Sequence, residues 1–80
     1  MPSSLQSKDY VQLIERLRSL RVQMDVTQRN LAEKLQRPQS FVSKTERLER
    51  RLDLAEFIEW ADALGTVPED LLRLLRTGSW

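Results

Sequence analysis

The chain has 80 residues, of which 40% are hydrophobic and 31% are charged, a composition typical of one small globular domain. It contains no cysteine and no histidine, which excludes disulfides, thiolate zinc sites, cysteine nucleophiles and imidazole chemistry. We therefore expect a protein that is not an enzyme and that uses no metal or cofactor. No apolar run approaches the roughly 20 residues of a membrane span, and the first residues lack a secretory pattern, so we expect a cytoplasmic protein.

The net charge of +1 is the sum of two parts of opposite sign. Residues 1–52 carry eleven Lys and Arg against six Asp and Glu, whereas residues 53–80 carry two against six. Ten of the thirteen cations are Arg, which suits phosphate groups and guanine edges. This asymmetry indicates that the basic part forms a polyanion-binding surface and that the acidic part forms a separate surface. The alternative explanation is that the charges simply lie on the solvated faces of a helical protein.

The first two predicted helices each carry an apolar stripe. In residues 9 to about 23, apolar side chains recur at three- and four-residue spacing, and Ser7 or Asp9 lies at the start of that helix. Thr27 is a good N-cap for a short second helix over residues 28–35. Both stripes predict packing against a common core.

The third predicted helix, at about 38–47, has few apolar residues. Pro38 suits its first turn because the proline ring fixes φ, and a tight connection at Gln36-Arg37 precedes it. A helix so poor in core residues is usually held by its neighbours while it presents one face to a partner. A merely solvated helix is the alternative.

The fourth and fifth predicted helices complete an all-α chain. Asp53 and Glu56 match a capping box that opens the fourth helix, and Gly65 supplies its left-handed C-cap. The fifth helix begins near Pro68 and is apolar nearly all round. A domain this small cannot easily cover so many leucine side chains by itself, so the fifth helix predicts an interface.

Two short helices joined by a three-residue turn, the second with a polar outer face, have the geometry that places a recognition helix in the major groove of DNA. The residues in question are TQRNLAEKL at 27–35 and RPQSFVSKTE at 37–46. They closely resemble the helix-turn-helix of the Xre/Cro family, the lambda-repressor-like DNA-binding domains, and the likeness spans roughly residues 9–75. The resemblance implies a compact five-helix bundle in which the second and third helices form the helix-turn-helix.

We expect this DNA-binding domain to cover residues 9–76, with flexible tails at residues 1–8 and 77–80. The resemblance implies a sequence-specific binder of double-stranded DNA that acts as a transcriptional regulator, and we expect a repressor. The residues expected to contact bases are Gln39, Ser40, Ser43 and Lys44. The residues expected to contact phosphates are Gln28, Arg37, Phe41, Arg47, Arg50 and Arg51.

Some of these positions have a second expected role. In similar proteins the glutamine at the position of Gln28 also supports the first glutamine of the recognition helix, here Gln39. Packing against the second helix is an equal alternative for Phe41. Arg21 and Glu46 match a pair that orients the recognition helix, and a weak surface pair is the alternative for them.

The chain departs from the family pattern at three positions. Gln36 stands in the turn where the family usually has Gly, and a left-handed Gln costs about 1 kcal/mol. Leu48 replaces another common Gly, so the third helix is expected to run longer or to end differently. Thr45 replaces a larger apolar or aromatic residue, which predicts weaker local packing.

We expect a homodimer that reads two half-sites of a palindromic operator about one helical turn apart. The residues expected at its interface are Trp60, Leu71, Leu72, Leu75 and Trp80. The alternative function is a protein-interaction or antitoxin-like module on the same scaffold, with a protein partner. The acidic second part of the chain and its apolar fifth helix support that alternative.

Overall fold

The structure is a computed structural model that describes residues 7–78. Within that range it contains five α-helices and no strand, which confirms the predicted all-α class. The helices are α1 (Lys8–Gln23), α2 (Gln28–Leu35), α3 (Gln39–Glu46), α4 (Leu54–Ala63) and α5 (Pro68–Thr77). Of the expected tails, residues 1–6, 79 and 80 lie outside the described residues. None of the described helices is both long and apolar enough to cross a membrane.

Side-chain caps fix where three of these helices begin. The hydroxyl groups of Ser7 and Thr27 each accept a backbone N–H three residues later, at 3.3 and 3.0 Å. The predicted N-cap at Thr27 is therefore confirmed, and of the two expected starts of the first helix the structure has Ser7 as the N-cap. Asp53 and Glu56 form the predicted capping box, with reciprocal bonds of 2.8 and 3.0 Å. Pro38 is the N-cap residue of α3, one position before the first turn in which it was expected.

Residues with a positive φ follow each of the helices α1 to α4. Gly65 has φ +72° after α4, as predicted, but Asp25, Gln36 and Leu48 adopt φ of +58°, +57° and +64° without being glycine. α3 ends at Glu46 and Leu48 takes the conformation that Gly would take, so α3 does not run longer. The missing glycines are therefore accommodated as backbone strain.

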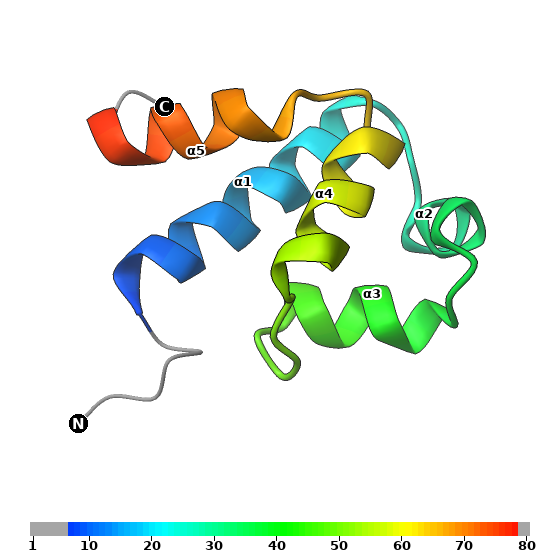
Figure 1. The fold of residues 1–80 in the computed structure, drawn as a ribbon. Helices are drawn as coiled ribbons and strands as arrows, with labels where there is room; N and C mark the ends of the chain where they lie inside the picture. The colour runs from blue at the N-terminus through cyan, green and yellow to red at the C-terminus, as the bar shows by residue number, and fades with distance from the viewer. Residues whose placement is uncertain (1–6, 79–80) are drawn as a thin grey trace.

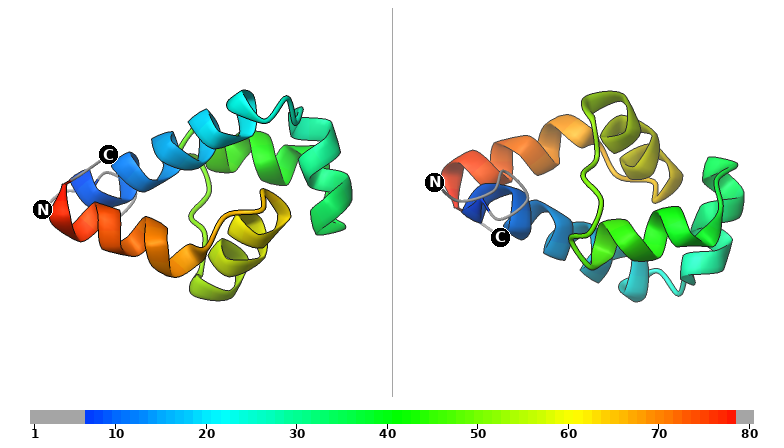
Figure 2. Two further views of the ribbon diagram at one scale, coloured as in Figure 1. Left: turned by 90° about the horizontal axis from the view of Figure 1, so that it is seen from above. Right: turned by 90° about the horizontal axis from the view of Figure 1, so that it is seen from below.

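The helices pack around one core, and α3 lies along an edge of the molecule away from α5 (Figure 1). Leu17, Leu31, Val42 and Leu64 are fully buried, which brings α1, α2, α3 and the end of α4 together. Figure 2 shows that the start of α1 lies beside the end of α5, with α2 at the opposite end of the molecule. One long side of α3 is consequently left uncovered by the other helices.

Two residues expected at a subunit interface lie in this core instead. Trp60 is 1% exposed and Leu71 is 4% exposed, so neither is available to a partner. Helical spacing explains Trp60, because Phe57 lies three residues before it and Leu64 lies four after it, on the same buried face. The expected interface residue Trp80 lies outside the described residues.

Replacing Gln36 with Gly should raise the free energy of unfolding by about 1 kcal/mol, because glycine adopts a positive φ without strain. The Gln36 side chain is exposed, so its removal loses little packing. Ser19→Gly is the control, since Ser19 is also exposed but lies in the interior of helix α1. The control should lower the free energy of unfolding by about 0.5–1 kcal/mol in denaturant titrations. Destabilisation by both substitutions would refute the strain at Gln36.

Candidate nucleic-acid interface

Helix α3 separates a buried face from an exposed polar face. Its buried residues are Phe41, Val42 and Thr45. The residues expected to contact bases share the opposite face, where Gln39, Ser40 and Lys44 are exposed and Ser43 is half-buried. The Thr45 hydroxyl donates to the carbonyl oxygen of Phe41 at 2.7 Å, so this buried polar group is satisfied. The polar face of α3 is therefore free to approach a ligand.

The expected pair of Arg21 and Glu46 is present and holds the C-terminal end of α3. Nε and Nη2 of Arg21 donate to the two carboxylate oxygens of Glu46 at 2.7 and 2.9 Å. Nη1 of Arg21 donates to the carbonyl oxygen of Val26 at 2.9 Å. The Arg21 and Glu46 side chains are 10% and 3% exposed, so this is a buried two-pronged pair and not a weak surface contact.

Gln28 joins the same network from the start of α2. Its side-chain Nε2 donates to Oε1 of Glu46 at 3.0 Å. Among the described residues, this bond takes the place of the expected contact between Gln28 and Gln39. The reason is geometric: the Arg21–Glu46 pair brings a carboxylate oxygen within reach of the Gln28 amide.

A second charged cluster lies at the N-terminal end of α3, around Phe41. The guanidinium carbons of Arg37 and Arg50 lie 4.7 and 4.6 Å from the centroid of the Phe41 ring. The Trp60 ring lies 5.9 Å away, tilted by 48°. Phe41 is only 8% exposed, so most of its ring packs inside the protein and little of it faces a ligand. The ring is covered by guanidinium groups and packs on α4.

The Glu56 carboxylate completes this second cluster. Its Oε1 accepts from Nη1 of Arg50 at 2.9 Å and from the backbone N–H of Asp53 at 3.0 Å. Its Oε2 accepts from Nη2 of Arg50 at 2.9 Å and from Nη1 of Arg37 at 3.4 Å. The hydrogen bonds from Arg50 are the largest of the effects that lower the pKa of Glu56 to about 2, against the opposing effect of burial.

Comparisons with known proteins agree with this geometry. The sequence profile of a family described as a helix-turn-helix domain matches residues 12–75. A solved structure, an XRE-family like protein from Pseudomonas syringae pv. tomato str. DC3000, is 44% identical to this chain. The match covers 90% of this chain and 88% of that chain, with a TM-score of 0.85. The chain belongs to the XRE family of helix-turn-helix proteins. No curated protein matches it.

Membership in the XRE family makes the chain a DNA-binding regulator, with α2 and α3 as its helix-turn-helix. Sequence reasoning anticipated the helix-turn-helix but missed the role of Glu56, which was assigned only to the capping box. The fixed spacing of the cap accounts for the bond to Asp53. The bonds to Arg37 and Arg50 join a turn and a loop to α4, and no sequence period marks such contacts.

The remaining expected phosphate-contacting cations of this XRE-family chain follow α3. Arg47 donates to Glu49 at 3.0 and 3.2 Å, and more than half of each side chain is exposed. The Arg51 guanidinium carbon lies 4.6 Å from the centroid of the Tyr10 ring. The Tyr10 hydroxyl accepts the backbone N–H of Leu52 at 2.9 Å, which fastens the loop after α3 to α1.

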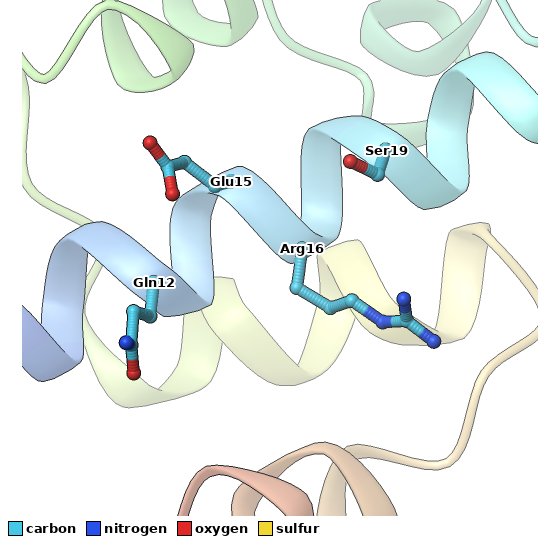
Figure 3. Close-up of a pocket in the computed structure, with 4 residues that line it drawn as sticks. All are labelled: Gln12, Glu15, Arg16 and Ser19. Atoms are coloured by element: carbon cyan, nitrogen blue, oxygen red, sulfur yellow. The ribbon is translucent and has the colours of Figure 1, made fainter. Parts of the chain in front are cut away.

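A hollow on α1 does not form a second site. Its lining residues, Gln12, Glu15, Arg16 and Ser19, all come from that one helix. Figure 3 shows Glu15 and Arg16 pointing to opposite sides of the helix, so their charged groups do not converge. A ligand in this hollow would be contacted from one element.

An apolar groove runs between α4 and α5. Its lining residues are Leu54, Phe57, Ile58, Asp62, Pro68, Glu69 and Leu72. Of the residues expected at a dimer interface, Leu72 is exposed at this groove and Leu75 is half-buried. The groove therefore leaves apolar surface uncovered on an element that does not belong to the helix-turn-helix.

The replacement Glu46→Gln should lower the free energy of unfolding by about 3 kcal/mol, because it leaves the buried Arg21 guanidinium without a counter-charge. Glu49→Gln is the matched control: it makes the same chemical change in the exposed Arg47–Glu49 pair and should leave the stability essentially unchanged. Denaturant titrations of both variants measure the contrast. Similar losses in the two variants would show that the Arg21–Glu46 pair does not hold α3.

The low pKa of Glu56 predicts a specific dependence of stability on pH. Because the folded-state pKa of about 2 lies below the ordinary value of 4.5, the charged carboxylate stabilises the fold above about pH 4.5. That contribution is lost as the pH falls towards 2. The difference in unfolding free energy between the wild type and Glu56→Gln should therefore shrink over this range in denaturant titrations. A difference that stays constant with pH would contradict the shift.

Proposed function

We propose that this chain binds double-stranded DNA sequence-specifically as a transcriptional repressor, with α3 in the major groove. The observation that carries the proposal is the exposed polar face of α3 on a helix whose other face is buried. Gln39 has the donor and acceptor needed to pair with N6 and N7 of adenine. Ser40 and Ser43 read bases less sharply, and Lys44 reaches a guanine edge or a phosphate.

The phosphate contacts in this proposal come from residues around α3. Arg37 precedes the helix, whereas Arg47, Arg50 and Arg51 follow it. The Arg37 and Arg50 side chains are each 38% exposed, which leaves part of each guanidinium open to solvent. Gln28, at the start of α2, is the further phosphate contact. Because phosphate contacts release counterions, affinity for DNA should fall steeply with salt.

The proposed assembly is a homodimer formed through the α4–α5 groove. Leu72, Ile58 and Leu54 are exposed apolar residues at that groove, and a second copy would cover them. Two copies related by a two-fold axis would place their α3 helices on half-sites about one helical turn apart. The operator would then be a palindrome.

Selection of bound sequences from a random duplex pool tests this function. The wild type should enrich a palindrome with half-sites about one helical turn apart. Gln39→Ala should relax the preference at one base position by about 1–3 kcal/mol, because it removes a paired contact to a base edge. Arg37→Ala should weaken binding to all sequences alike, because it removes a phosphate contact. Equal losses on selected and random duplexes for both variants would contradict this division of roles.

A protein-interaction module is the second candidate function. The carboxylates of Asp62 and Glu69 line the apolar α4–α5 groove, and this arrangement favours a basic, amphipathic segment of another protein as its occupant. A gel shift at low salt against a random duplex separates the two functions. A pure interaction module should show no salt-sensitive DNA binding.

A further inference from the structure

Arg37 and Arg50 come from different segments of the chain but share one platform and one counter-ion. Arg37 lies in the turn before α3, and Arg50 lies in the loop between α3 and α4. Both guanidinium groups lie within 4.7 Å of the Phe41 ring centroid, and both donate to the Glu56 carboxylate. The ring and the carboxylate therefore hold the two cations in one place.

This place lies next to the base-reading end of α3. Arg37 precedes Gln39 by two residues and Phe41 lies in the first turn of the helix, so the cluster is at the N-terminal end of α3, where Gln39 and Ser40 begin the helix. The Phe41 and Glu56 side chains are almost fully buried, whereas both arginine side chains remain partly exposed. The buried groups form the floor of the cluster, and the guanidinium groups form its outer surface.

The charges in this cluster do not balance. The guanidinium groups of Arg37 and Arg50 share the Glu56 carboxylate, which leaves one net positive charge among these three groups. Nη1 of Arg37 bonds Glu56 at 3.4 Å, whereas Arg50 makes two bonds of 2.9 Å to the same carboxylate. Arg50 is the more firmly held cation, and Arg37 keeps more of its guanidinium donors for another acceptor.

We propose that Arg37 and Arg50 together form a single site for one backbone phosphate of duplex DNA, with Phe41 as its platform and Glu56 as the residue that sets its charge. This inference rests on the proposed DNA-binding function and adds a role for Glu56, which does not contact DNA. Glu56 acts through the arginines: it orders two long side chains before DNA arrives and cancels one of their two charges.

The charge-setting role predicts an effect of Glu56→Gln on the salt dependence of binding. Gln still accepts the hydrogen bond of the capping box but carries no charge. Without the carboxylate, the second guanidinium charge is available to a second phosphate. The slope of log affinity against log salt should then steepen by about 0.9, which is about 3.5-fold more loss of affinity between 50 and 200 mM salt.

The experiment measures the fluorescence anisotropy of a labelled random-sequence duplex with the full chain over a series of salt concentrations. Glu59→Gln is the matched control, since it removes the same charge from an exposed residue of the same helix. The control should keep the wild-type slope. Arg50→Gln makes the opposite change, because it removes a positive charge from the site, at a partly exposed residue. It should make the slope shallower by about 0.9.

A double variant shows whether Glu56 acts through the arginines. In the Arg37→Gln/Arg50→Gln background, Glu56→Gln should leave the slope unchanged, because no cation remains for the carboxylate to neutralise. The inference is overturned if Glu56→Gln keeps the wild-type slope, if Glu59→Gln steepens it equally, or if the effect persists in the double background. Wild-type binding with no salt dependence would instead overturn the DNA-binding function itself, and the inference with it.

Discussion

Helix α3 has to be held rigidly while one of its faces stays bare, and this constraint shapes the rest of the domain. Only Phe41, Val42 and Thr45 of α3 are buried, so apolar packing alone does little to fix the orientation of the helix. Buried carboxylates fasten both ends of the helix. At the C-terminal end, Glu46 accepts hydrogen bonds from Arg21 of α1. At the N-terminal end, Glu56 of α4 accepts hydrogen bonds from Arg37 and Arg50, whose guanidinium groups lie over Phe41.

The choice of arginine follows from this constraint. A carboxylate in the last turn of a helix faces the negative end of the helix dipole, so Glu46 requires a strong counter-charge. Arg21 supplies it with two parallel bonds, and its third nitrogen fixes the α1–α2 connection through Val26. A lysine ammonium is a single nitrogen and cannot make two parallel bonds to the carboxylate while also reaching Val26 from a third nitrogen. The orientation of α3 thus depends on the planar fork of the guanidinium group.

The starts of α1, α2 and α4 were predictable from the sequence because the residues that begin these helices act locally. Ser7, Thr27 and Asp53 each bond a backbone N–H three residues later, so spacing alone locates them. The Arg21–Glu46 pair was predictable because the chain resembles a family in which the residues at those two positions form a pair. The burial of Trp60 and the cluster around Glu56 were not predictable, because they depend on how α3 and α4 cross and on where a loop places Arg50.

The two left-handed residues that flank α3, Gln36 and Leu48, differ in whether side-chain packing offsets their backbone strain. Gln36 is exposed and contributes little packing in return for its strained backbone, so glycine would serve better there. Leu48 differs, because its side chain packs against the core while its backbone has φ +64°. Glycine at Leu48 would relieve about 1 kcal/mol of strain but lose a comparable amount of apolar burial. The loop after α3 thus keeps its conformation through tertiary contacts, including the Leu52–Tyr10 bond, and these contacts place Arg50 over Phe41.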